Sequence, residues 1–260
     1  MCVDRLDADH FVFDLEDSVA QSQKVQARDS IARFLEGRES GNLLVRIHSP
    51  AEPAFVDDVE LMRAFEGVGI VLPKITDAST LHELADVLDV RRRRVIGLVE
   101  SLAGVEAVER MVDRSPIRLF GLGIGVEDML TSSFFTETEL SSLVGHVKCR
   151  LAVTCLTRGI VPIDGICPEV NDVGAIARHC RRGRSTGMVG KFTIHPRQIP
   201  VANQMFWPDS ASRAWAERIM EQAGPVSETG YQRVGDLLIT PPKVKKARWI
   251  LNQLREPNHG

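Results

Sequence analysis

The sequence predicts an α/β fold with a parallel sheet, of a size that suits a single barrel of alternating strands and helices. Short apolar runs rich in β-branched residues begin near residues 10, 43, 69, 95, 118, 160 and 187. Segments of helical length separate these runs, and this alternation is typical of βαβ units with right-handed connections. The chain has 260 residues, which one α/β barrel can use as a single domain.

The expected strands are short and mostly apolar, as buried parallel strands are. They span residues 9–15, 43–47, 69–72, 95–99, 118–122, 160–163 and 187–193. These are seven strands, where a closed (β/α)8 barrel has eight. Residues 1–8 are too few for a strand with its helix and fit the tail of a helix. We therefore expect either a barrel whose first βα unit is missing or truncated, or a barrel that is open at that edge.

The segments between the strands are expected to be helices, and Asp77 or Ser79 is a candidate cap for one of them. These helices span residues 18–36, 54–65, 76–90, 101–110, 138–158 and 172–182. The alternation ends after Pro196. An amphipathic helix, 210–223, a loop, 224–240, and a basic helix, 243–254, then follow. We expect a barrel domain, 1–206, and a C-terminal helical arm or lid, 207–260; a packed terminal helix with a solvated basic face is the alternative.

The composition excludes several classes of protein. The formal net charge is −3, which argues against a general nucleic-acid binder. No apolar run approaches the roughly 20 residues of a membrane-spanning helix, and the first residues lack the apolar core of a signal peptide. The five cysteines are odd in number and form no C-x-x-C pair. We expect reduced thiols in a cytoplasmic protein.

Two carboxylates follow the central pair of strands. Glu100 comes directly after the run 95–99, and Asp128 follows the next run and its glycine loop. The carboxyl ends of parallel strands meet at one edge, where barrel enzymes place their chemistry, and converging carboxylates suit Mg²⁺. Helix capping is the alternative for each acid. The G-x-G-x-G spacing is not a dinucleotide fingerprint, because Val126 stands where a third glycine is needed.

Several motifs occur together and in a fixed order. They are F-D-L-E-D-S-V-A (13–20), V-R-I (45–47), L-P-K-I (72–75), L-V-E-S (98–101), F-G-L-G-I-G-V-E-D (120–128) and G-K-F-T-I-H-P-R-Q-I (190–199). With these motifs the chain resembles the citrate lyase β-subunit-like branch of the HpcH/HpaI aldolase family. The resemblance implies a TIM-type (β/α)8 barrel, a Mg²⁺ site, and homotrimers or hexamers. It also implies lyase or Claisen-type chemistry on small carboxylic acids, usually as acyl-CoA thioesters.

The resemblance assigns roles to four residues. Glu100 and Asp128 are the expected metal ligands, and Glu100 also lies next to the substrate. Arg46 is expected to bind a substrate carboxylate or carbonyl oxygen, and a guanidinium suits this role because it stays charged and binds a carboxylate bidentately. Glu16 is expected to serve catalysis by orienting Arg46 or metal-bound water; a strand-end acid that bonds local backbone is the alternative.

Two departures from the family pattern bear on function. The family's opening R-S-x-L-F-V-P-G-like strand and basic helix, which help to bind the CoA nucleotide, have no match here. Thr240 stands where the family's acyl-CoA lyases carry an Asp, and threonine cannot titrate near neutrality. We expect a Mg²⁺-dependent carbon–carbon lyase of the citryl-CoA or malyl-CoA type, acting through a metal-stabilised enolate. The alternatives are an aldolase on free 2-oxo acids and a non-catalytic subunit of a lyase complex.

Overall fold

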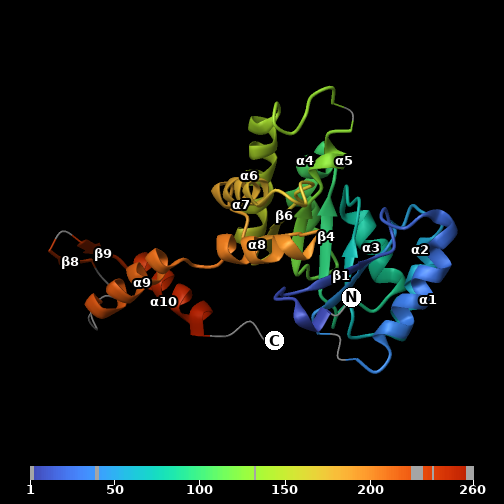
Figure 1. The fold of residues 1–260 in the computed structure, drawn as a ribbon, viewed down its shortest axis with the longest axis horizontal. Coiled ribbons are helices and arrows are strands. Elements are labelled where there is room, and N and C mark those ends of the chain that lie inside the picture. Colours follow the sequence, from blue (N-terminus) through green and yellow to red (C-terminus); the bar gives the residue numbers. More distant parts are fainter. Residues whose placement is uncertain (1–2, 39–40, 132, 224–230, 236, 256–260) are drawn as a thin grey trace. The chain divides into compact units, whose positions relative to one another are not determined.

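The computed structural model describes residues 3–38, 41–131, 133–223, 231–235 and 237–255. Its centre is a curled sheet of seven parallel strands, each paired with the next in sequence order (Figure 1). Within the described residues the sheet is open, because its first and last strands do not pair. The strands are β1 (Phe11–Asp14), β2 (Leu43–Arg46), β3 (Gly69–Leu72), β4 (Val95–Val99), β5 (Gly121–Ile124), β6 (Val161–Asp164) and β7 (Gly190–Lys191).

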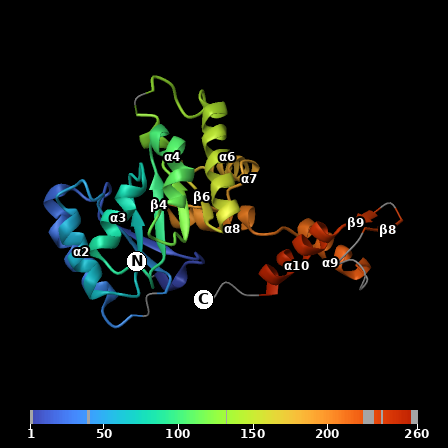
Figure 2. The ribbon, with the colours of Figure 1, turned by 180° about the vertical axis from the view of Figure 1, so that it is seen from behind.

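Helices connect successive strands and pack against one another in chain order, α1 on α2, α3 on α4 and α4 on α6 (Figures 1 and 2). They are α1 (Lys24–Leu35), α2 (Phe55–Ala64), α3 (Ala78–Val87), α4 (Leu102–Asp113), α5 (Val126–Met129), α6 (Ser141–Arg158), α7 (Val173–Ser185) and α8 (Ile199–Phe206). Aspartates cap two of these helices, α3 and α7, since Asp77 accepts from the backbone N–H of Ser79 and Asp172 from that of Ala175.

Alternate residues of the strands form an apolar cluster on one face of the sheet. Leu44, Ile96, Leu98 and Ile163 are buried there, and Phe192 packs against them. In a strand, residues two apart share a face. The face that carries Leu44 therefore continues to Arg46, and the face that carries Ile96 and Leu98 continues towards Glu100.

The fifth strand corrects one expectation. We expected a strand over residues 118–122 followed by a glycine loop, but β5 lies within the glycine run itself. The physical reason is that neighbouring side chains leave no room for a Cβ atom in this strand. A Cβ at Gly123 would come within 2.6 Å of the Phe192 ring and 2.7 Å of Leu98. Glycine lets these larger side chains fill the interior, so a run that looks like a flexible loop is a buried strand.

The last part of the chain forms a unit of its own. Contacts divide the chain into Met1–Ala202 and Asn203–Gly260. The second unit contains α9 (Ser210–Gln222), β8 (Gln232–Val234), β9 (Leu237–Ile239) and α10 (Pro241–Arg255), with Ile219 of α9 and Ala247 of α10 in its core. The expected loop over residues 224–240 is corrected by the antiparallel hairpin β8–β9. A domain boundary between residues 206 and 207 stays a prediction.

We expected residues 1–8 to be the tail of a helix. The described part of this segment contains a 3-10 turn, Val3–Arg5, before β1, and residues 1 and 2 lie outside the described residues, so the helix tail stays a prediction. Seven strands agree with the number that we predicted from the apolar runs. A missing or truncated first βα unit stays a prediction.

Candidate active site

Charged side chains follow the carboxyl ends of five neighbouring strands. β1 ends at Asp14 and β2 at Arg46, and these two residues are partners in the sheet register. Lys74 follows β3, Glu100 follows β4, and Asp128 lies in the first turn of α5 after β5. The carboxyl ends of parallel strands form the edge at which α/β enzymes bind their ligands. We therefore take this edge as the candidate active site.

Arg46 is held by carboxylates from the first strand and the loop after it. Its Nε lies 2.7 Å from Asp14 Oδ1 and its Nη2 lies 2.5 Å from Oδ2, a bidentate pair. Its Nη1 lies 3.1 Å from Glu16 Oε2 and 3.8 Å from Asp17 Oδ2. Burial opposes ionisation of Asp14, but the hydrogen bonds from Arg46 outweigh it and hold the pKa of Asp14 at about 2. The guanidinium is thus fixed in orientation and stays charged.

Lys74 joins two of the site's acids through different atoms. Its Nζ lies 2.7 Å from Glu16 Oε1 and 3.4 Å from Glu52 Oε1. Its backbone N–H donates to Glu100 Oε2 over 2.9 Å. The residue has φ of 53°, in the left-handed region that side chains rarely adopt. Such a conformation costs about 1–3 kcal/mol and persists only where the surroundings enforce it. The strained backbone points the N–H of Lys74 at Glu100 while its side chain reaches Glu16.

Glu100 is buried, and its carboxyl group ionises with difficulty. Burial raises its pKa to about 7; the N–H of Lys74 works against this rise, while the charges of Glu16 and Asp128 add to it. A Cβ on Gly125 would lie 2.7 Å from Glu100 Cγ and 3.0 Å from Oε1. The side chain therefore rests against the backbone that leads into α5. Helix capping, the alternative role for this acid, is wrong, because Ser101 caps α4 by accepting from the Gly104 N–H.

Asp128 is exposed, and its charge contributes to the raised pKa of Glu100. Among the described residues, neither Asp128 nor Glu100 forms an ion pair of its own, whereas Arg46 and Lys74 are already paired with other acids. Two neighbouring carboxylates without a cation would be stabilised by a bound one. The donors are oxygens alone, which is the set that Mg²⁺ prefers. The residues present therefore fit a magnesium ion.

The structure brings Arg46 and Glu16 into direct contact and links both to Glu100 through Lys74. Sequence reasoning did not single out Asp14 or Lys74. The sequence places Asp14 beside two other acids near the end of the first expected strand, but only the sheet register identifies it as the partner of Arg46. The role of Lys74 depends on its left-handed backbone, which no sequence pattern indicates.

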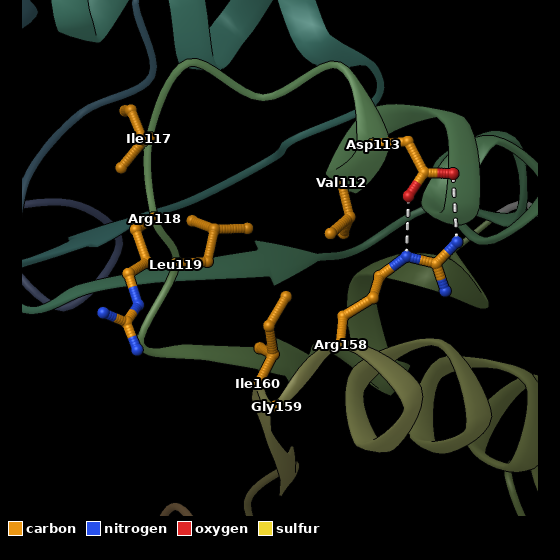
Figure 3. A pocket seen from close by; sticks show the side chains of 8 residues that line it. All are labelled: Val112, Asp113, Ile117, Arg118, Leu119, Arg158, Gly159 and Ile160. Atoms are coloured by element: carbon orange, nitrogen blue, oxygen red, sulfur yellow. Dashed lines mark hydrogen bonds and ion pairs between the residues drawn. The ribbon is translucent and has the colours of Figure 1, made fainter.

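Two cavities lie at the other end of the sheet. One is lined by residues that precede β5 and β6, with the ion pair between Arg158 and Asp113 at its rim (Figure 3). The other is lined by Glu66, Asp89, Arg91 and Arg92, which precede β3 and β4. In barrel folds this end serves stability rather than chemistry. Neither cavity includes a residue of the candidate active site.

Known proteins resemble this chain in sequence and in fold. Residues 3–196 match the HpcH/HpaI aldolase/citrate lyase family. The chain belongs to this family. The family prediction is thereby confirmed. Among relatives in this family, a (3S)-malyl-CoA thioesterase of Cereibacter sphaeroides is 32% identical over 222 residues, which cover 82% of this chain and 74% of the relative. An L-malyl-CoA/beta-methylmalyl-CoA lyase of the same species is 28% identical, over 95% of this chain and 87% of the lyase.

Solved structures of the HpcH/HpaI aldolase/citrate lyase type resemble this chain as well. The protein CitE of Mycobacterium tuberculosis in complex with magnesium, acetoacetate and coenzyme A superposes with a TM-score of 0.78 at 25% identity. The match covers 96% of this chain and 91% of CitE. A second complex of CitE, with magnesium and pyruvate, gives a TM-score of 0.69 at 26% identity and covers 82% of this chain and 89% of CitE.

None of the described helices is both long enough and apolar enough to cross a bilayer.

Proposed function

We propose that this chain is a Mg²⁺-dependent carbon–carbon lyase that acts on a small carboxylic acid or its CoA thioester. The observation that carries the proposal is the pair of carboxylates, Glu100 and Asp128, which form no ion pair within the described part of the chain, beside a fixed guanidinium, Arg46. Family membership supports it, as do the relatives named as lyases and the complexes of CitE with magnesium and small oxo acids.

Each residue has a part in this proposal. Glu100 and Asp128 hold the ion, and Glu100 contacts the substrate beside it. Bound Mg²⁺ would act as a Lewis acid on the substrate's carbonyl oxygen, where negative charge develops as the carbon–carbon bond breaks. Arg46 binds a substrate carboxylate through the guanidinium N–H groups that its contacts with Asp14 and Glu16 leave over, one on Nη1 and one on Nη2. Glu16 positions Arg46 and Lys74 by lying between them.

A second candidate is an aldolase that acts on free 2-oxo acids without CoA. The observation that favours it concerns Thr240, which occupies the position of the family's acidic residue. Its Oγ1 lies 3.5 Å from the backbone N of Lys243, at the start of α10, so here it works as a helix cap. A non-catalytic subunit is less well supported, because the acids and the guanidinium of the site are all present. A homotrimeric or hexameric assembly and a cytoplasmic location remain part of the proposal.

The test measures Mg²⁺ binding and turnover on the same preparations. Glu100→Gln and Asp128→Asn should each lower Mg²⁺ affinity at least about tenfold, since loss of even an outer-shell partner has effects of that size. Glu127→Gln is the matched control, because it removes an exposed acid from the same turn of α5. Unchanged Mg²⁺ affinity in both site variants, measured by titration calorimetry, would contradict the assignment.

Turnover is assayed on citryl-CoA, malyl-CoA, oxaloacetate and 4-hydroxy-2-oxo acids. Carbon–carbon cleavage yields an acyl-CoA and an oxo acid, whereas thioester hydrolysis releases free CoA thiol, so product analysis separates a lyase from a thioesterase. Arg46→Lys should reduce turnover about 10²-fold, because the planar fork that binds oxygen is lost. Release of thiol without an oxo acid from the CoA thioesters would refute lyase activity.

A further inference from the structure

Three side chains with different ligand atoms gather after β6, on elements other than those that carry the residues assigned above. Cys167 and Glu169 lie on the loop between β6 and α7, and His179 lies within α7. One ligand atom from each, the thiol sulfur, a carboxylate oxygen and an imidazole nitrogen, lies within 4.8 Å of the other two. Cys167 is buried, His179 is half-buried and Glu169 is exposed, so the group opens to solvent on one side.

The loop that carries these ligands is fixed from two directions. The buried side chain of Gln198 donates from Nε2 to the carbonyl of Cys167 over 2.9 Å. Asp172 caps α7 by accepting from the Ala175 N–H over 3.0 Å. The Cys167 thiol also donates to Glu169 Oε2 over 3.2 Å. The ligand atoms are thus held near one another by contacts that do not require a metal.

The two ammonium groups near these ligand atoms are paired with a carboxylate, which reduces their repulsion of a bound cation. Lys148 and Lys191 lie close by, but both are paired with the buried Asp164, at 2.8 and 3.2 Å. The imidazole of His179 offers a nitrogen lone pair, which joins the Cys167 sulfur and a Glu169 oxygen as possible metal donors.

We propose that Cys167, Glu169 and His179 form a second metal site, which takes Zn²⁺ or a similar borderline ion rather than Mg²⁺. The donor set of one sulfur, one nitrogen and one oxygen matches zinc chemistry, whereas magnesium requires oxygens. Three protein ligands leave the fourth tetrahedral position to water or a small anion. The ion joins the β6–α7 loop to α7, so its binding stabilises this part of the fold.

The test uses Zn²⁺ and the spectroscopic probe Co²⁺ on the full chain, with saturating Mg²⁺ present. Wild type should bind one Zn²⁺ and show a rise in Tm, and Co²⁺ should give the near-ultraviolet absorption of a thiolate–cobalt bond. Glu169→Gln and His179→Ala should each lower Zn²⁺ affinity at least about tenfold. Cys167→Ser should abolish the thiolate–cobalt band. If that variant does not fold, the Zn²⁺ affinities of Glu169→Gln and His179→Ala decide the test.

The controls are Cys149→Ser and His146→Ala, which remove an exposed cysteine and an exposed histidine on α6. Both should bind Zn²⁺ as wild type does, and Glu100→Gln should do so as well, which separates this site from the proposed Mg²⁺ site. The inference is overturned if Glu169→Gln and His179→Ala bind Zn²⁺ with unchanged affinity. It is also overturned if the binding disappears in Cys149→Ser or His146→Ala.

Discussion

Glu100 should make Mg²⁺ binding depend on pH in the neutral range. Its pKa is raised from 4.5 to about 7, so below neutrality a proton competes with the metal for the same carboxylate. We expect Mg²⁺ affinity to fall as pH drops through 7, approaching about tenfold per pH unit, as one competing proton requires. Calorimetric titrations between about pH 5.5 and about pH 8.5 measure this. A flat profile would show that Glu100 is not a ligand.

The same shift has a consequence for the metal-free protein. A carboxyl group with a raised native pKa binds more protons in the folded than in the unfolded state. Between pH 4.5 and about 7 its contribution to the free energy of unfolding therefore decreases as pH rises. Glu100→Gln removes this slope, and comparing the two proteins by urea unfolding isolates it from other groups.

At the scale of single residues, the sequence was sufficient to name Arg46, Glu16, Glu100 and Asp128 as candidates. It could not name Lys74, because a left-handed φ at a residue other than glycine arises from tertiary constraint rather than local preference. It also could not show that Asp14 is the acid closest to Arg46, since three acids lie within four residues there and only the sheet register separates them.

At the scale of elements, the turn between β5 and α5 controls the position of Glu100. Gly125 has φ of −100° and ψ of 93°, which alanine can adopt, so a substitution acts through contact alone. The added Cβ of Gly125→Ala would lie 2.7 Å from Glu100 Cγ. We expect the carboxylate to move and Mg²⁺ affinity to fall about tenfold or more.

The matched control for this substitution is Gly145→Ala. Gly145 lies within α6, and a Cβ there meets nothing within 4 Å. Alanine at that position should raise the free energy of unfolding by about 0.5–1 kcal/mol and leave Mg²⁺ binding unchanged. If Gly125→Ala also leaves Mg²⁺ binding unchanged, Glu100 does not hold the ion in the position that the structure gives it.

Elements were predictable where aliphatic residues dominate a run and were misplaced where every second residue is glycine. β2, β3 and β4 consist mostly of aliphatic residues, with at most one glycine each, and their positions agree with the prediction. The start of β5 was displaced by three residues, because the side chains of Leu98 on β4 and of Phe192, which follows β7, leave room only for glycine at residue 123. The hairpin β8–β9 was missed since its strands have only three residues each, too few for an alternating pattern to emerge.

At the scale of the whole molecule, Thr240→Asp tests whether the second unit supplies a proton donor to an active site. Asp caps a helix about as well as Thr, so α10 should be preserved. If the resemblance places this residue correctly, cleavage of citryl-CoA or malyl-CoA should rise, by up to about 10²–10⁴-fold. Thr240→Asn is the control, because it caps a helix but does not titrate. Equal cleavage rates for Thr240→Asp and Thr240→Asn would show that another group transfers the proton.

The whole architecture followed from the alternation of strands and helices, which gave seven parallel strands in chain order. Whether the sheet closes was not predictable, because closure depends on pairing between β1 and β7, about 180 residues apart, and no local pattern reports such a contact. From the end of this alternation the sequence predicts a boundary between residues 206 and 207, and contacts divide the chain between residues 202 and 203.

The buried trio of Lys148, Asp164 and Lys191 restricts the order in which mutations can be tolerated. Asp164 pairs with both ammonium groups, and Glu137 lies 3.9 Å from Lys148, so among the described residues loss of Asp164 leaves Lys191 without a carboxylate partner, an effect of about 3–5 kcal/mol for breaking a buried pair. The Oδ2 of Asp164 would also lie 2.6 Å from a Cβ at Gly183. Removing either side of this group leaves a buried charge behind, so a lineage can replace Asp164 only together with a compensating change at Lys191. It can enlarge residue 183 only once Asp164 has been replaced.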